Sequence, residues 1–345
     1  MPESKPHVAL LWKKEGASLR CNLCNRHCLI PQGKRGGCGV RENQKGTLIA
    51  LTYGRPCSVA VDPIEKKPFN HFWPGSSVLS LSTVGCNFHC AFCQNWTISQ
   101  AKPEDFNAEF VEPELIVQAA IENNCQGIAY TYTEPTVFFE YCNDIAKLAA
   151  REKLYNVFVT NGYMTQDMLK LAKWMDAANV DLKSFSDEFY MKTCGGVHIQ
   201  PILDNIKWMR KHKIHVEVTT LVVPGENDTP AELKKISEWA AGVDKDMPLH
   251  FSRFHPDYKM MDKQITPAKT LEIAYKQAEE AGVKYVYVGN IPGHDGESTY
   301  CPKCNHLLIQ RKGFFVNKTE LDEKKTGFFC PECGTKQNIL GKIIR

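Results

Sequence analysis

The chain of 345 residues lacks a strong charge of either sign, and it lacks long apolar runs, repeats and low-complexity tracts. Its 42 Lys and Arg residues nearly balance 39 Asp and Glu residues, so the composition gives no electrostatic support for binding nucleic acid. No uninterrupted apolar stretch has the length that a membrane-spanning helix needs. The first residues, Met1 to Pro6, lack the apolar core of a signal peptide. We therefore expect a cytoplasmic protein that binds neither membranes nor nucleic acid.

Cysteine, in contrast, is abundant, with 15 residues. Disulfide bonds are the usual reason in small secreted domains, but no secretion signal is seen here, and most of these cysteines are grouped at the spacings of metal ligands. The isolated ones, which we expect to be ordinary buried side chains, are Cys57, Cys125, Cys142 and Cys194. The others form three clusters and indicate metal binding.

Short β-rich runs alternate with amphipathic helical stretches from about residue 78 to residue 291. This alternation predicts parallel strands joined by crossover helices. Strands are expected at 78–83, 127–132, 156–160, 179–182, 216–223, 249–254 and 285–288, and helices at 112–123, 137–152, 165–178, 203–212, 230–241 and 267–281. About six such units indicate an α/β fold, a partial (β/α)6 barrel, because a full eight would need more chain than remains.

Two segments of different composition flank this barrel. We expect an N-terminal metal-binding segment at 1–75, the barrel at 76–292 and a C-terminal ribbon-like segment at 293–345. Each flanking segment contains four clustered cysteines among short β-like runs, for example 47–53 in the first and 313–316 in the second.

The most informative cluster consists of Cys86, Cys90 and Cys93, which follow the first predicted strand with the spacing C-x3-C-x2-C. A [4Fe–4S] cluster usually takes four cysteine ligands, so three thiolates leave one iron open for chemistry. The alternative is zinc, which takes four ligands in structural sites, with His89 as the fourth.

Polar residues follow the later strands in the same way. Because the active site of a parallel barrel lies at the C-terminal ends of its strands, we expect these side chains to meet near the three cysteines. They are Glu134 after the second strand, Asn161 after the third, Asp181 and Lys183 after the fourth, and His255 after the sixth. Each residue alone has an ordinary explanation, such as a solvated ion pair, but their shared position favours one functional site.

With Phe92 directly before the third cysteine, the C-x3-C-x-F-C loop resembles that of the radical S-adenosylmethionine (SAM) superfamily. The resemblance implies that Cys86, Cys90 and Cys93 bind a [4Fe–4S] cluster whose open iron is chelated by the amino and carboxylate groups of SAM. It further implies that one electron from the cluster cleaves SAM to methionine and a 5′-deoxyadenosyl radical. In this family the residue at Phe92 approaches the adenine, and the acid at Glu134 holds the amino group of the cofactor.

The second-strand motif departs from the family pattern, because Tyr132 and Thr133 replace the glycines of Gly-Gly-Glu-Pro. Other motifs resemble those of pyruvate formate-lyase activating enzyme: Asp-Leu-Lys after the fourth strand, Val-Val-Pro-Gly after the fifth and a histidine after the sixth. This resemblance implies that Asp181, Lys183 and His255, together with Asn161, lie near the cofactor. Val159 stands where that enzyme has an acid, which puts a cation site built on that acid in doubt.

Longer strings in the N-terminal segment resemble the radical enzymes of the AmmeMemoRadiSam system. They are Gly33 to Asn43, Tyr53 to Pro56 and Asp62 to Pro68. The resemblance covers roughly residues 19–345 and implies companion proteins of the Amme and Memo types. It also implies an electron donor such as flavodoxin or ferredoxin.

The two outer clusters predict further metal sites. Cys301, Cys304, Cys330 and Cys333 form two C-x2-C pairs, which fit a four-cysteine zinc ribbon, with rubredoxin-like iron as the alternative. Cys21, Cys24, Cys28 and Cys38 fit either zinc or a second iron–sulfur cluster, and the ligand count does not separate the two.

The leading functional hypothesis is therefore a radical SAM enzyme that abstracts a hydrogen atom from an unidentified substrate, which is a protein or peptide if the chain acts as an activating enzyme. The alternative is a non-catalytic metal-binding adaptor that docks partners through its zinc-ribbon segments, with the barrel as a scaffold. Replacing Cys90 separates the two, because only the enzyme needs that thiolate.

Overall fold

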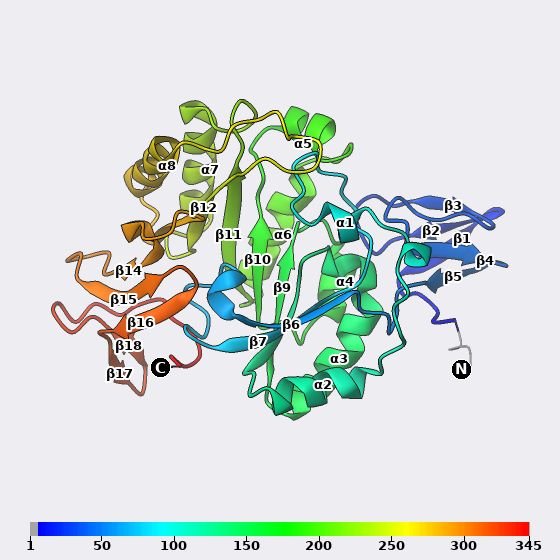
Figure 1. Cartoon of the computed structure of the whole chain (residues 1–345), viewed down its shortest axis with the longest axis horizontal. Coiled ribbons are helices and arrows are strands. Elements are labelled where there is room, and N and C mark those ends of the chain that lie inside the picture. The colour runs from blue at the N-terminus through cyan, green and yellow to red at the C-terminus, as the bar shows by residue number, and fades with distance from the viewer. Residues whose placement is uncertain (1–5, 345) are drawn as a thin grey trace.

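A curved eight-stranded sheet forms the centre of the molecule in the computed structural model, which describes residues 6–344 (Figure 1). Residues 1–5, on which most of the expectation about a signal peptide depends, lie outside the described residues. The sheet order is β13-β12-β11-β10-β9-β8-β7-β6. The parallel strands are β7 (Ser77–Ser82), β8 (Gly127–Tyr130), β9 (Tyr155–Thr160), β10 (Ala177–Asp181), β11 (His215–Val222), β12 (Leu249–Arg253) and β13 (Val286–Gly289). β6 (Ser58–Pro63) pairs with β7 in the antiparallel direction.

Helices connect the parallel strands and cover the outside of the sheet (Figure 1). The longer ones are α2 (Pro113–Glu122), α3 (Phe139–Arg151), α6 (Gln200–Lys211), α7 (Pro230–Val243) and α8 (Ala268–Ala281). The central strands are buried along nearly their whole length, as expected for parallel strands covered on both faces. The predicted α/β partial barrel is therefore confirmed. None of the helices within 6–344 combines the length and apolar character needed to cross a membrane.

Local sequence signals explain where several of these helices begin and end. Thr229 accepts a hydrogen bond from the Glu232 N–H at 3.3 Å, and Pro230 occupies the first helical position of α7. The helix α8 ends at Gly282, which adopts φ +94°, a left-handed conformation that favours glycine.

The structure differs from the expected elements in three places. The helix predicted at 165–178 is only α4 (Gln166–Leu171), because Trp174 turns inward and packs against Tyr130 and Phe158 with ring centroids 5.7 and 5.5 Å away. The short helices α1 (Trp96–Ser99) and α5 (Asp187–Thr193) had not been expected. The β-like run at 313–316 begins with a turn, where Gly313 has φ +61°.

The two flanking segments lie at opposite ends of the long axis (Figure 1). The N-terminal segment forms a three-stranded sheet of β1 (Trp12–Glu15), β2 (Ser18–Cys21) and β3 (Leu29–Pro31), beside the hairpin of β4 (Arg41–Gln44) and β5 (Thr47–Ala50). The C-terminal segment contains β14 (Thr299–Tyr300), β15 (Leu307–Lys312), β16 (Phe315–Thr319), β17 (Asp322–Lys324) and β18 (Gly327–Phe329). Side chains of the first belong to the barrel core, whereas the second has a small core of its own.

The segment that follows β6 fills the interior of the sheet near the N-terminal ends of its strands. The buried carboxylate of Glu217 accepts hydrogen bonds from the backbone N–H groups of Asn70 and His71 at 3.0 and 2.8 Å. The Asn179 amide donates to the Pro68 carbonyl at 2.8 Å. We call residues 69–72 the floor segment, because the hydrogen bonds of Asn70 and His71 to Glu217 place it inside the sheet.

Candidate active site

The C-terminal ends of the parallel strands surround a cavity of about 390 Å³. It brings together nearly all the residues that the sequence placed at strand ends. Those that line it are Cys86, Cys90, Phe92, Cys93, Glu134, Asn161, Asp181 and Lys183. The barrel therefore gathers the predicted cluster ligands and the predicted polar residues around one space.

The three-cysteine loop has a fixed shape that depends on its neighbours. Gly85 adopts φ +94°, and a Cβ there would lie 2.8 Å from the Cys38 carbonyl oxygen and 2.5 Å from Val40. The Phe88 N–H donates to the Cys86 Sγ at 3.3 Å, and the Ser99 hydroxyl lies 3.2 Å from the Cys93 Sγ. Polar groups of the protein thus already face two of the three sulfurs.

The short helix α5 holds the other side of this loop. The N–H groups of His89 and Ala91 donate to the carbonyls of Cys194 and Thr193 at 3.1 and 2.9 Å. The Cys194 side chain also contacts Cys90 and lowers its pKa. Cys194, expected to be an ordinary buried residue, is buried but is part of the support for the cluster loop.

His89 has a polar partner on each ring nitrogen. Its Nδ1 lies 2.6 Å from the Gln100 Oε1, and its Nε2 lies 3.1 Å from the Gly37 carbonyl oxygen. These contacts give no support to His89 as the fourth ligand of a zinc site, which stays an alternative.

Glu134 connects the ends of β8 and β9. Its Oε1 accepts hydrogen bonds from the Thr136 N–H, the Thr136 hydroxyl and the Thr160 hydroxyl at 3.0, 2.5 and 2.7 Å. Its Oε2 accepts one from the Asn161 N–H at 2.8 Å. Burial raises the pKa of Glu134, and these donors oppose that rise. Three of these four hydrogen bonds go to Oε1 and one goes to Oε2, so Oε2 is the less occupied oxygen.

Tyr132 occupies one of the two positions at which the motif that this chain resembles has glycine. It adopts φ +64°, a left-handed conformation that is costly for a residue other than glycine. Its hydroxyl donates to Asp62, and the Lys67 Nζ lies 4.1 Å from the centre of its ring. Burial alone would raise the pKa of Asp62, but Lys66, Lys67 and Tyr132 outweigh burial and hold it below its usual range. Sequence reasoning missed Asp62 and Lys67, because they lie on β6 and after it rather than at a parallel strand end.

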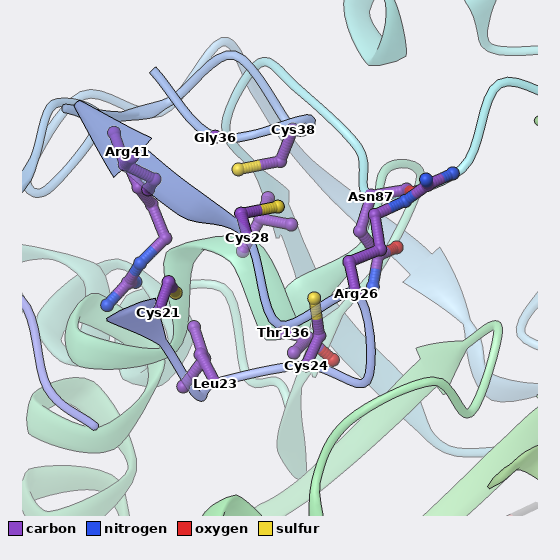
Figure 2. Close-up of a pocket in the computed structure, with 12 residues that line it drawn as sticks. Cys21, Leu23, Cys24, Arg26, Cys28, Gly36, Cys38, Arg41, Asn87 and Thr136 are labelled. Atoms are coloured by element: carbon purple, nitrogen blue, oxygen red, sulfur yellow. The ribbon is translucent and has the colours of Figure 1, made fainter. Parts of the chain in front are cut away.

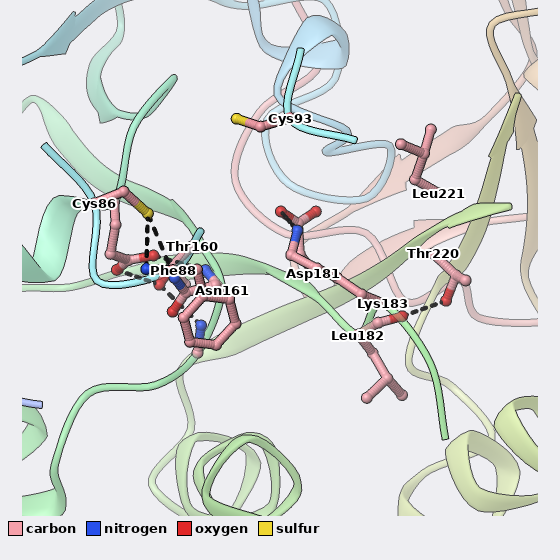
Figure 3. Close-up of polar contacts among 12 residues, drawn as sticks. Cys86, Phe88, Cys93, Thr160, Asn161, Asp181, Leu182, Lys183, Thr220 and Leu221 are labelled. Carbon is pink, nitrogen blue, oxygen red and sulfur yellow. Dashed lines mark hydrogen bonds and ion pairs between the residues drawn. The ribbon is translucent and has the colours of Figure 1, made fainter. Parts of the chain in front are cut away.

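Asp181 and Lys183 form an ion pair across the cavity from Cys86 (Figure 3). The Lys183 Nζ lies 2.9 Å from the Asp181 Oδ2 and 5.7 Å from the centre of the Phe92 ring. The Tyr190 hydroxyl accepts a hydrogen bond from the Lys183 backbone N–H at 2.9 Å. The predicted pair thus exists, and it stands beside the aromatic ring of the cluster loop.

Asn87 is a buried residue of the site that sequence reasoning missed. Its Oδ1 accepts a hydrogen bond from the Asn161 side-chain amide at 2.7 Å and lies 3.9 Å from the Cys86 Sγ. Its backbone carbonyl accepts a hydrogen bond from the Arg26 guanidinium, which also donates to the Gly195 carbonyl at 2.7 Å. The only local signal was a polar residue inside the cysteine motif.

His255 is the one predicted site residue that does not line the cavity. It is exposed after β12, and its Nδ1 lies 3.4 Å from the carbonyl oxygen of the adjacent Pro256. Its predicted contact with a cofactor stays a prediction.

The outer cysteines form two different arrangements. In the C-terminal segment the Sγ atoms of Cys301 and Cys333 are 3.5 Å apart and those of Cys304 and Cys330 are 3.6 Å apart. All four sulfurs lie within 4.8 Å of one another and could hold a metal ion. In the N-terminal segment the four cysteines line a separate small cavity (Figure 2).

Comparison with known proteins agrees with this site. A sequence model of the radical SAM superfamily matches residues 80–240. An uncharacterized protein of Methanocaldococcus jannaschii is 47% identical over 329 residues, which cover 95% of this chain and 97% of that protein. A second protein of that organism, whose name proposes that it activates a glycyl-radical enzyme, is 26% identical over 219 residues, covering 61% of this chain and 79% of that protein.

Among solved structures, a radical SAM methyltransferase from Sphaerobacter thermophilus shares the fold, with a TM-score of 0.51 and 13% identity. The matched region covers 68% of this chain and 71% of that one. The fold and the three-cysteine cavity define an enzyme of the radical SAM type. The chain belongs to the radical SAM superfamily and is distantly similar to activating enzymes of glycyl-radical proteins.

Proposed function

We propose that Cys86, Cys90 and Cys93 bind a [4Fe–4S] cluster and that SAM occupies the cavity above it. The observation that carries this proposal is the convergence of three thiols on one cavity of about 390 Å³, because that space leaves room for a ligand on a fourth iron. When bound, the cluster supplies the electron that cleaves SAM to methionine and a 5′-deoxyadenosyl radical.

The residues of the chain bind and orient the cofactor. Glu134 offers Oε2, its less occupied oxygen, to the cofactor's amino group, since Oε1 faces Thr136 and Thr160. Phe92, beside the Lys183 Nζ, offers a flat apolar face to the adenine. The Asp181–Lys183 pair offers polar groups to the cofactor from the opposite wall.

We further propose that the substrate is a protein or peptide from which the radical abstracts a hydrogen atom. The similarity to a protein whose name proposes that it activates a glycyl-radical enzyme supports this substrate class. The AmmeMemoRadiSam resemblance supports companion proteins of the Amme and Memo types, with a flavodoxin or ferredoxin as the electron donor. Such chemistry requires a reducing compartment, which fits a cytoplasmic protein.

For the C-terminal quartet we propose zinc. Sulfurs around one zinc ion stand about 3.8 Å apart when each is about 2.3 Å from the metal, and the distances of 3.5 and 3.6 Å fit that geometry. Such an ion would stabilise a segment whose own core is small.

The decisive experiment is anaerobic incubation of the full chain with SAM and a strong reductant. We expect methionine and 5′-deoxyadenosine from the wild-type protein, and at least a hundredfold less from Cys90→Ala, because an incomplete ligand set does not hold the cluster. Cys125→Ala, a buried cysteine outside the site, is the matched control. An intact cluster that releases neither product, or a Cys90→Ala chain that still supports the protein's function with its partner, would instead favour the adaptor.

A further inference from the structure

We infer that Cys21, Cys24, Cys28 and Cys38 bind a second iron–sulfur cluster and not zinc. The sequence leaves both metals open, because four thiolates suit either. The geometry of the folded segment separates them. This inference concerns the metal alone and does not depend on how SAM is used.

The first argument is the separation of the sulfurs. Two thiolates that touch the same zinc ion lie at most about 4.6 Å apart, which is twice the zinc–sulfur bond length. Within residues 6–344, the C-terminal quartet is the only group of three or more cysteine, histidine or acidic side chains whose ligand atoms all lie within 4.8 Å. No three of the four N-terminal thiols therefore reach one zinc ion as they stand. Thiolates around an iron–sulfur cluster stand farther apart, because they bind different iron atoms.

The second argument is the space that the four cysteines enclose. They line a cavity of about 20 Å³, which is enough for one water molecule. Figure 2 shows the four side chains around this space, with Arg41 on one side and Arg26 and Asn87 on the other. In the C-terminal quartet, by contrast, the paired sulfurs lie 3.5 and 3.6 Å apart. The N-terminal cysteines are thus arranged around a space, and the C-terminal ones are in contact.

Two adjacent glycines lie next to Cys28. A Cβ on Gly36 would lie 3.7 Å from the Cys28 Sγ and 3.2 Å from Ile30, and a Cβ on Gly37 would lie 3.9 Å from the same sulfur. The Gly37 N–H lies 3.4 Å from the Cys28 Sγ and donates to it. Backbone N–H groups of Arg26 and Val40 donate to the sulfurs of Cys24 and Cys38. Hydrogen bonds of this kind stabilise the negative charge of cluster thiolates.

The cavity also lies directly against the three-cysteine loop. Asn87, the residue after Cys86, lines the N-terminal cavity, while Cys86 lines the active-site cavity. The Cys38 carbonyl oxygen also lies close to Gly85, at the start of the same loop. A cluster in the N-terminal segment would therefore be a neighbour of the active-site cluster rather than a remote structural metal.

The test is metal analysis of the full chain, expressed and purified without oxygen. We expect more than four irons and four acid-labile sulfides per chain, with about one zinc from the C-terminal quartet. Replacing Cys86, Cys90 and Cys93 by alanine should leave the second cluster in place. Cys24→Ser with Cys38→Ser should remove the iron above four, while Cys57→Ser, an isolated cysteine, should change nothing. Four irons or fewer in the folded wild-type chain, with or without a second zinc, overturns the inference.

A spectroscopic measurement keeps the inference testable if a variant fails to fold. In wild-type protein enriched in ⁵⁷Fe, addition of SAM should change the Mössbauer signal of the one open iron, which is clearly less than a quarter of the iron if a second cluster is present. A change in a full quarter of the iron would overturn the second cluster. Loss of the SAM response with both clusters present would instead count against the proposed function.

Discussion

The two four-cysteine segments have the same number of potential ligands and both contain C-x2-C pairs, yet they fold into different sites. In the C-terminal segment the sulfurs are in contact, at 3.5 and 3.6 Å. In the N-terminal segment they surround a cavity. Ligand count and spacing in sequence therefore predict that a metal binds, but the backbone around the cysteines determines which metal fits.

The segments also make different contacts with the barrel, although Phe314 of the C-terminal segment lines the active-site cavity as well. The N-terminal segment contacts the three-cysteine loop through Arg26, which donates to the Asn87 and Gly195 carbonyls. The C-terminal segment contacts the floor segment, where Arg311 donates to the Asn70 carbonyl at 2.8 Å and His71 lies 2.8 Å from the Asn338 carbonyl oxygen. Loss of the first should disturb the active site, and loss of the second should disturb folding.

The largest effect is expected from Cys330→Ser, which removes a buried ligand of the C-terminal quartet. Metal binding supplies on the order of 10 kcal/mol to the folding of small zinc domains, so the segment should lose its zinc and become sensitive to proteases. Limited proteolysis with mass spectrometry, compared with Cys125→Ser, measures this directly. A variant whose C-terminal segment stays resistant to proteases would contradict the proposed difference between the two quartets.

The barrel and its site were largely predictable, because their signals are local. Alternating β-rich and amphipathic stretches gave the order of the parallel strands, and each polar motif followed its strand. Glu134, Asp181 and Lys183 reached the cavity for that reason. His255 did not, because the chain after β12 turns outward and exposes it.

Contacts between distant parts of the chain were not predictable from local patterns. Arg26 meets Asn87 across 61 positions, and Tyr132 meets Asp62 across 70. The helix α5, which holds the cluster loop, has only seven residues and a weak sequence signal. The separation of the N-terminal sulfurs likewise depends on how β2, β3 and the following loop pack on the barrel.

A smaller effect, restricted to stability, is expected from Glu217→Gln beneath the floor segment. His215 and His250 donate to the two oxygens of Glu217 at 3.0 and 2.7 Å. Burial alone would raise the pKa of Glu217, but these hydrogen bonds outweigh burial and hold it well below its usual value. The ionised carboxylate therefore contributes stability that is complete above about pH 4.5 and is lost as pH falls through the lower folded pKa.

Denaturant unfolding at neutral pH should show a loss of roughly 3 kcal/mol in Glu217→Gln, because each hydrogen bond to a buried charged group contributes about 1.5–3 kcal/mol. The difference in unfolding free energy from wild type should narrow as the pH falls below about 4.5, because the carboxylate of the unfolded chain then takes up a proton while the native one stays ionised. The exposed Glu238, changed to Gln, should cost less than about 1 kcal/mol. If the difference in unfolding free energy between Glu217→Gln and wild type stays constant with pH, Glu217 stabilises the fold through its shape and not through its charge. Iron content should be unchanged, which keeps this contact separate from the N-terminal segment.

A still smaller effect is expected from Arg26→Ala, which removes the hydrogen bonds to the Asn87 and Gly195 carbonyls. Hydrogen bonds to charged groups contribute about 1.5–3 kcal/mol, so the three-cysteine loop should open more often. Iron should be lost to a chelator about tenfold faster, which corresponds to about 1.4 kcal/mol. Arg20→Ala is the matched control, because Arg20 contacts only Glu15 and His27 within its own segment. Equal rates in the two variants would show that the N-terminal segment does not support the loop.

The smallest change in iron–sulfur absorbance is expected when a zinc chelator is added to the wild-type protein at neutral pH. Cys304 is exposed, so the C-terminal ion is open to attack, whereas Cys21 is buried behind the N-terminal strands. About one zinc should leave each chain while the visible absorbance of the iron–sulfur clusters stays nearly constant. If no zinc is released and iron accounts for every site, the C-terminal quartet is rubredoxin-like. The distance between sulfurs would then separate mononuclear sites from clusters, but it would not separate zinc from iron, since both ions bind four thiolates in a tetrahedron.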